Sequence, residues 1–239
     1  MQHEHAMRTI GLIGGMSWES SAEYYRIINQ QVRARLGPLR SAPILMYSVD
    51  FGPIEQAQRE GRWDDAGAVL EDAARRLQAG GADCIVLCTN TMHLLARRIE
   101  DAVGLPLLHI ADPVGHAAAQ SGALTVGLLG TAFTMEQAFF KDRLGARHGL
   151  TVLTPHAPER EELHRIIYEE LCAGVVSDAS RQVYRQAIDG LAARGAQAVI
   201  LACTEISLLV GPGDSALPLF DTTALHAQAA LEFALGGAI

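Results

Sequence analysis

Two copies of one short segment occur in this chain, and each ends a predicted strand with a small side chain that can carry a proton. Residues 81–91 align without a gap on residues 195–205, and the alignment sets Thr89 opposite Cys203. General acid–base catalysis is carried out by side chains that accept and donate protons. We therefore expect Thr89 and Cys203 to serve opposite faces of one small substrate.

Cys203 follows an apolar run and precedes a helix that we expect to begin near Thr204. Backbone N–H groups and the dipole at a helix start favour a thiolate, so a thiol with a reference pKa of about 8.5 can become a general base there. The alternative is an inert buried thiol, because cysteine is among the most buried residue types. The duplication favours a functional cysteine.

Cys88 precedes Thr89 and aligns with Ala202. Neighbouring strand residues point to opposite faces, so Cys88 is expected to lie in the core. A threonine is then the counterpart of Cys203. Because a hydroxyl is a poor base without strong activation, Thr89 is expected to relay or donate a proton, or to position a water.

Further polar residues follow the same two strands. Asn90, Thr91 and Thr204 offer donors suited to a substrate carboxylate, and helix capping is their alternative role.

Histidines also accompany the repeats. His93 and His226 fall at similar depth in the two halves, while His109 and Asp221 share one aligned position. Either pair is suited to orienting the central residues, or merely to closing strand ends. No cysteine and histidine spacing matches a structural zinc site, and we predict no metal.

The glycine-rich stretch Gly11–Ser17 lacks the spacing of both common phosphate-binding loops. Its glycines permit a tight turn or the close approach of a small ligand. Pyridoxal phosphate needs a lysine for its Schiff base, and the only lysine, Lys141, stands in a polar stretch typical of a solvated helix face. We predict no cofactor.

The 239 residues are 49% hydrophobic and 19% charged, with a net charge of -8, which is typical of a globular protein. No apolar run approaches the roughly 20 residues of a membrane-spanning helix, and the first residues lack the apolar centre of a signal peptide, so we expect a cytoplasmic protein. The acidic balance and the lack of a basic cluster argue against nucleic-acid or membrane partners. The four cysteines are expected to be free thiols.

Short apolar runs alternate with helical patterns, which favours parallel strands joined by crossover helices. Strands are expected at Thr9–Gly14, Pro43–Asp50, Cys84–Cys88, Leu105–Ile110, Leu124–Gly130, Leu150–Thr154, Ala198–Cys203 and Leu217–Asp221. Helices are expected at Trp18–Leu36, Trp63–Gln78, Glu159–Leu171 and Ala179–Ala193. The first helix is expected to bury Tyr25, Ile28, Val32 and Leu36.

The duplication extends along the chain, because residues 9–14 recur at 125–130 and residues 105–108 at 217–220, in the same order. We predict an α/β fold of two pseudo-symmetric domains, each with a four-stranded parallel sheet flanked by helices. Residues 8–112 plus 216–239 form the first predicted domain, and residues 113–215 form the second. Ligands bind beyond the carboxyl ends of such strands, so the active site is expected in the interdomain cleft.

Three segments, Ile10–Ser20, Cys88–His93 and Ala202–Ile206, together resemble the aspartate/glutamate/hydantoin racemase family. The resemblance covers nearly the whole chain. It implies racemisation without pyridoxal phosphate by two opposed cysteines, of which Cys203 matches the second while Thr89 replaces the first. The branch it looks most like includes aspartate/glutamate racemases, some preferring the L-enantiomer, and broad-specificity amino-acid racemases.

The same resemblance implies that Met16 and Gln58 lie near the substrate and that a homodimer forms. Typical aspartate racemases of the family bind the substrate side chain with two basic residues, and the approximate equivalents here are Glu55 and Cys172.

We therefore expect a cofactor-independent racemase of aspartate, glutamate or a broader set of amino acids. One alternative is a single-cysteine decarboxylase or cis–trans isomerase of a small dicarboxylic acid. Another is a non-catalytic protein that binds a small acid.

Overall fold

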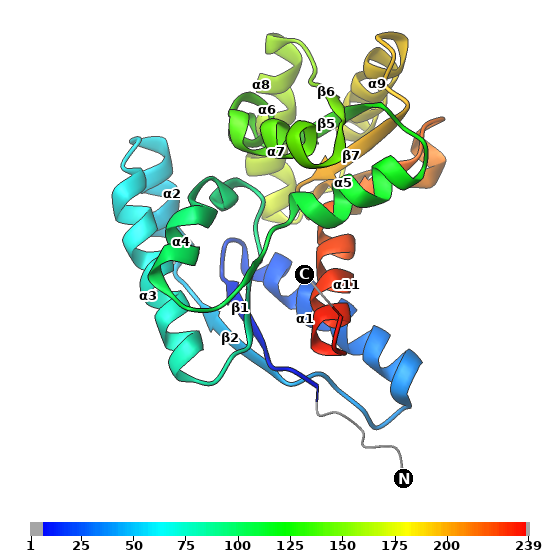
Figure 1. The fold of residues 1–239 in the computed structure, drawn as a ribbon. Helices are drawn as coiled ribbons and strands as arrows, with labels where there is room; N and C mark the ends of the chain where they lie inside the picture. Colours follow the sequence, from blue (N-terminus) through cyan, green and yellow to red (C-terminus); the bar gives the residue numbers. More distant parts are fainter. Residues whose placement is uncertain (1–6, 238–239) are drawn as a thin grey trace. The chain divides into compact units, whose positions relative to one another are not determined.

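The computed structural model describes residues 7–237, and the chain divides into two compact units (Figure 1). The first unit ends at His109 and resumes at His226, and the second spans Ile110–Leu225. Each unit has its own sheet and its own hydrophobic core.

The first unit is built on a parallel four-stranded sheet in the order β2-β1-β3-β4. Its strands are β1 (Ile10–Gly14), β2 (Ile44–Ser48), β3 (Cys84–Leu87) and β4 (Leu107–Leu108). Its helices are α1 (Trp18–Leu36), α2 (Phe51–Arg59), α3 (Trp63–Ala79), the 3₁₀ helix η1 (Thr91–Leu95), α4 (Ala96–Ala102) and, from His226 onward, α11 (Thr222–Ala234).

The central strands of this sheet are buried on both faces, which is why they read as continuous apolar runs. Side chains such as Ile13 and Ile85 pack against α2 and α3. Their neighbours, such as Leu12 and Val86, pack on the other face against α1 and α11. Period-two alternation therefore decides which core each strand residue enters.

The second unit repeats this plan with a parallel sheet in the order β6-β5-β7-β8. Its strands are β5 (Thr125–Gly130), β6 (Thr151–Leu153), β7 (Ala198–Ala202) and β8 (Leu219–Asp221). Its helices are α5 (Ala111–Gln120), α6 (Ala132–Glu136), α7 (Ala138–His148), α8 (Ala157–Arg165), the π-helical η2 (Ile166–Glu170), the 3₁₀ helix η3 (Leu171–Ala173), α9 (Asp178–Ala193), α10 (Ile206–Leu209) and the 3₁₀ helix η4 (Pro212–Asp214).

The duplication extends to the pairing of the strands. Ile85 of β3 pairs with Leu107, and its aligned residue Val199 of β7 pairs with Leu219. All eight predicted strands are present, so the predicted pair of four-stranded parallel sheets flanked by helices is confirmed.

The buried face of α1 differs from the prediction by one position at its start. Tyr24 is fully buried, whereas Tyr25 is 52% exposed and Leu36 is 39% exposed. Residues one apart on a helix are separated by about 100° around its axis, so an adjacent tyrosine pair leaves the face ambiguous. The buried tyrosine is the one whose hydroxyl has a partner, because Tyr24 Oη is 2.8 Å from Nδ1 of His226.

Two further differences concern element boundaries. The helix predicted at Glu159–Leu171 is divided into α8, η2 and η3. The chain re-enters the first unit at His226 and not at residue 216, because β8 pairs with β7 inside the second sheet.

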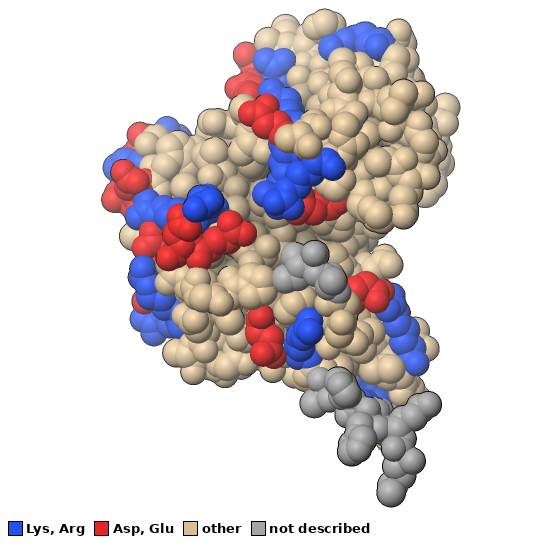
Figure 2. Space-filling model, in the orientation of Figure 1, with Lys and Arg blue, Asp and Glu red and all other residues tan. Residues whose placement is uncertain are grey.

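Charges on the surface are mixed in sign. Figure 2 shows Lys and Arg side chains beside Asp and Glu over the visible face, and α3 contributes i,i+4 pairs such as Arg75–Glu71 and Arg76–Asp72. Within residues 7–237 no helix is both long and apolar enough to cross a membrane.

The buried face of α1 can be tested with a matched pair of substitutions. Ile28→Ala leaves a cavity beneath α1 and is expected to cost about 2–5 kcal/mol of stability, whereas Tyr25→Ala at an exposed position is expected to cost within about 0.5 kcal/mol. The unfolding midpoint in urea measures both. A larger loss for Tyr25→Ala than for Ile28→Ala would contradict this assignment.

Candidate active site

Two adjacent residues that follow β3 in the first unit differ in burial. Cys88 is fully buried in the core beneath α1, and burial raises the pKa of its thiol. Thr89, the next residue, is partly exposed. Cys88 is therefore a core residue, as predicted, and Thr89 is the side chain presented beyond the strand.

Glycines bring the loop after β1 close to the end of β2. Gly15 has φ +98°, and a Cβ built on it would lie 2.1 Å from the Val49 carbonyl oxygen. The backbone N–H of Gly15 donates to Ser21 Oγ at 2.8 Å, and that of Val49 donates to the Gly14 carbonyl at 2.9 Å. This stretch is a tight turn in close contact with a neighbouring strand end, which only glycine permits.

Met16 and Gln58, predicted to lie near the substrate, are both buried in the first unit. Met16 packs in the same core cluster as Met92 of η1, and Gln58 Nε2 lies 2.6 Å from Met92 Sδ. Gln58 Oε1 has no hydrogen-bond partner among the described residues. Buried amide oxygens are nearly always bonded, so this one is suited to a ligand N–H group.

The end of β7 shows the same difference in burial in the second unit. Ala202 is buried and Cys203 is partly exposed. Cys203 Sγ donates to Oε2 of the buried Glu205 at 3.0 Å. A thiol and a carboxylate therefore share a hydrogen bond at the position equivalent to Thr89.

This environment corrects the thiolate that the sequence predicted. Burial raises the pKa of the Cys203 thiol well above its ordinary value, and the negative charge of Glu205 and the hydrogen bond to it raise it further. The helix expected near Thr204 begins at Ile206 and is a single turn, so its dipole is too small to offset these effects. The thiol form of Cys203 is therefore favoured, and its Sγ is hydrogen-bonded to the Glu205 carboxylate.

The predicted carboxylate-binding residues fall into two sets. Asn90 and Thr91 lie in the first unit and Thr204 in the second. Asn90 is at the N-cap position of η1 but its side chain makes no capping bond, and Thr204 precedes the N-cap residue Glu205 of α10. Helix capping, the alternative role, is thus not observed for Asn90.

The sequence placed His93 and His226 in different halves, and this placement is wrong for His226. His93, His109 and His226 all lie in the first unit. The His93 ring is 4.6 Å from the His109 ring and 5.7 Å from the His226 ring, between centroids. Asp221 lies in the second unit, where its Oδ1 accepts a hydrogen bond from the backbone N–H of Thr223 at 2.8 Å.

Neither position equivalent to a side-chain-binding base carries a cation. Glu55 pairs with Arg59 at 3.4 Å, and Cys172 is an exposed thiol. Lys141 donates to the Glu136 carbonyl at 3.0 Å. No group of three potential metal ligands occurs in the part of the chain that the structure describes.

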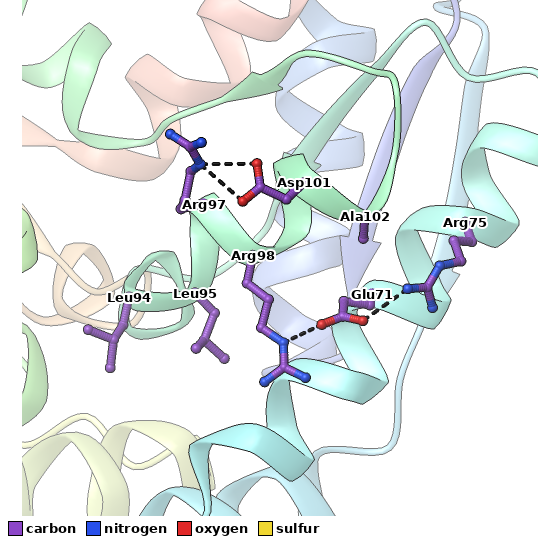
Figure 3. A pocket seen from close by; sticks show the side chains of 8 residues that line it. All are labelled: Glu71, Arg75, Leu94, Leu95, Arg97, Arg98, Asp101 and Ala102. Carbon is purple, nitrogen blue, oxygen red and sulfur yellow. Dashed lines mark hydrogen bonds and ion pairs between the residues drawn. The ribbon is translucent and has the colours of Figure 1, made fainter.

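A surface pocket of about 490 Å³ lies elsewhere in the first unit (Figure 3). Its wall comes from α3, η1 and α4, and its three arginines all face carboxylates. Arg75 and Arg98 bind Glu71, and Arg97 binds Asp101 at 3.0 Å. Each of the three arginines is thus paired with a carboxylate of the same wall.

Comparison with known proteins identifies the family of this chain. Residues 13–230 match the Asp/Glu/hydantoin racemase family. The chain belongs to this family. A candidate Asp/Glu racemase from Yersinia pestis is 55% identical with a TM-score of 0.90, covering 96% of this chain and 100% of that one. An aspartate racemase homologue from Pyrococcus horikoshii is 32% identical with a TM-score of 0.83, covering 95% and 99%.

The broad specificity amino-acid racemase RacX of Bacillus subtilis is 22% identical over 229 residues, which covers 92% of this chain and 95% of RacX. The family is one of racemases and RacX is an amino-acid racemase; racemases are isomerases, so this family member is an enzyme of that class.

Glu205 is the residue of this racemase that sequence reasoning missed. It aligns with Thr91 of the first copy, so the duplication offered a signal: a carboxylate stands where the other half has a hydroxyl. Its contact with the thiol depends on the turn after β7, which residue type alone does not reveal.

The effect of Glu205 on the thiol can be measured directly. Because the carboxylate favours the protonated thiol, Glu205→Gln is expected to lower the pKa of Cys203. Alkylation by iodoacetamide at pH 7 should then be faster, by about tenfold for each pH unit by which the pKa falls. Peptide mass spectrometry between pH 6 and 10 would follow Cys203 in a Cys172→Ser background.

Glu161→Gln, an exposed change in the same unit, is the matched control and is expected to leave the profile unchanged. An alkylation profile for Glu205→Gln that is unchanged or moved to higher pH would contradict the assigned role.

Proposed function

We propose that this protein racemises an α-amino acid by removing and returning the Cα proton, with Cys203 on one face of the substrate and Thr89 on the other. The observation that carries the proposal is the thiol–carboxylate pair of Cys203 and Glu205 at a strand end whose equivalent presents Thr89. Family membership supplies the reaction class.

Glu205 gives Cys203 a route to act as a base without releasing a proton to water. The pair holds one proton, and its transfer from Sγ to Oε2 generates a thiolate beside a neutral carboxyl group. The thiolate then takes the Cα proton while the electron pair remains on the substrate as an enolate. In the reverse direction the raised pKa of the thiol keeps it protonated and ready to donate.

Thr89 serves the opposite face with a hydroxyl. An alcohol proton is less acidic than a thiol proton, so transfer there is expected to be slower and to proceed through a bound water. The two faces are consequently unequal in rate. This inequality cannot make the reaction one-way, because enantiomers have equal free energy.

Substrate binding is assigned to the remaining predicted residues. Asn90, Thr91 and Thr204 bind the α-carboxylate and stabilise the charge that develops on it as the proton leaves. Met16 lies against the substrate, and the buried Oε1 of Gln58 accepts from the substrate ammonium. Aspartate, glutamate and uncharged amino acids are all candidates, because the positions that bind acidic side chains in aspartate racemases here carry Glu55 and Cys172.

Proton exchange in D₂O tests the reaction. Single L- and D-amino acids, including aspartate and glutamate, are incubated with the protein, and NMR follows loss of the Cα proton while chiral chromatography follows the opposite enantiomer. We expect both with at least one amino acid, and Cys203→Ala is expected to slow racemisation by about 10³-fold. Absence of exchange with every amino acid would refute racemisation, and decarboxylation of substituted malonates would then be assayed.

The identity of the second group is tested at Thr89. Thr89→Cys replaces a hydroxyl by a thiol of reference pKa about 8.5 and is expected to speed proton removal from the slower enantiomer about tenfold or more. Thr89→Ser keeps a hydroxyl and is expected to stay close to wild type. Unchanged rates with both enantiomers in Thr89→Cys would exclude Thr89 as the second group.

A further inference from the structure

Two buried side chains hold the turn that carries Thr89. Ser20 Oγ donates to the Cys88 carbonyl at 3.1 Å, and His93 Nδ1 donates to the Thr89 carbonyl at 2.7 Å. A carbonyl only accepts, so the hydrogen of His93 in this bond is on Nδ1. Both side chains are 2% exposed, and they come from different elements, α1 and η1.

These two bonds fix the backbone on both sides of one residue. The Cys88 carbonyl belongs to the peptide plane before Thr89 Cα, and the Thr89 carbonyl belongs to the plane after it. With both planes held, φ and ψ of Thr89 are set, and so is the direction in which its Cβ points. The backbone N–H of Cys88 adds a third restraint, since it donates to the Ile13 carbonyl at 2.9 Å.

His93 is itself held by a second layer of polar side chains. Its ring contacts those of His109 and His226. Nε2 of His226 donates to the Leu108 carbonyl at 2.7 Å, and in the neutral ring Nδ1 then accepts from Tyr24 Oη at 2.8 Å. The His93 ring therefore packs against the His226 ring, whose orientation is fixed by two hydrogen bonds.

Apolar side chains could fill this part of the core at a lower cost in free energy than these polar rings. Burying imidazole and phenol groups costs free energy unless their polar atoms are bonded, whereas leucine or phenylalanine carries no such requirement. Tyr24, His93, His109 and His226 are each at most 6% exposed. Of these four, His93 bonds the Thr89 turn directly, and the others pack behind it.

We infer that Ser20 and His93 are positioning residues for Thr89, holding its hydroxyl where it transfers the proton on its face of the substrate. This inference rests on the proposed racemisation. Displacement of a reacting group by about 1 Å can cost as much as 10²-fold in rate, so loss of the His93 bond is expected to act on proton transfer at the Thr89 face alone.

The two enantiomers separate this role from a merely structural one. For the enantiomer whose Cα proton faces Cys203, that residue alone can remove the proton and return deuterium from D₂O to the same face. Exchange with retention then needs no help from Thr89, and only racemisation does. For the opposite enantiomer Thr89 must remove the proton, so exchange and racemisation both depend on it.

His93→Leu is the test variant, and His93→Asn is its conservative partner, because Asn Nδ2 replaces the Nδ1 donor. Ser20→Ala removes the other bond with little change of volume. Val32→Ala is the control, since Val32 is buried in the same helix as Ser20 but has no hydrogen bond to the turn. Each variant is assayed with both enantiomers in D₂O.

In His93→Leu, racemisation is expected to fall about 10- to 100-fold while exchange of one enantiomer stays within about twofold of wild type. His93→Asn should recover most of the loss, Ser20→Ala should show the same one-sided effect, and Val32→Ala should not. Equal loss of exchange with both enantiomers, no recovery in His93→Asn, or no effect at all would overturn the inference.

If His93→Leu does not fold, Ser20→Ala and His93→Asn carry the same comparison. Failure of the proposed function is a separate result, because wild-type protein would then exchange no amino acid.

Discussion

The alternation of side chains at the carboxyl ends of β3 and β7 is the constraint on which the candidate site depends. Both faces of each strand are buried, and adjacent residues point to opposite faces. At the strand ends Cys88 and Ala202 are buried, and both are small and apolar enough to pack there. Thr89 and Cys203, the next residues, are only partly buried, although Cys203 still packs against the core of the second unit.

The two strand ends solve the burial of polar groups in different ways. In the second unit Cys203 contacts the buried carboxylate of Glu205, and a negative charge in such surroundings is tolerated because the thiol donates to it. In the first unit the buried groups are imidazoles and hydroxyls, which hold carbonyl oxygens of the backbone. In the second unit two side chains thus bond each other, while in the first unit side chains bond the backbone of the Thr89 turn.

Much of the fold was predictable because the two halves of the chain are similar in sequence and can be aligned with each other. Eight strands, their parallel arrangement and the equivalence of Thr89 with Cys203 follow from repeated segments and from buried parallel strands reading as apolar runs. The face of α1 was harder, because Tyr24 and Tyr25 are adjacent and only the contact of Tyr24 with His226 selects between them. The pKa of Cys203 is shifted opposite to the predicted direction, because burial and a neighbouring carboxylate raise it and only a single helical turn follows.

Taken by itself, the sequence determined the α/β architecture, the duplication, the reaction family and the two residues that end the central strands, because hydrophobic periodicity and self-similarity are properties of order along the chain. Only the tertiary structure decided the direction in which the pKa of Cys203 is shifted, the contact of its thiol with Glu205, and the gathering of His93, His109 and His226 in the first unit. Ionisation depends on burial and on charges within a few ångströms, and those distances do not exist until the chain has folded.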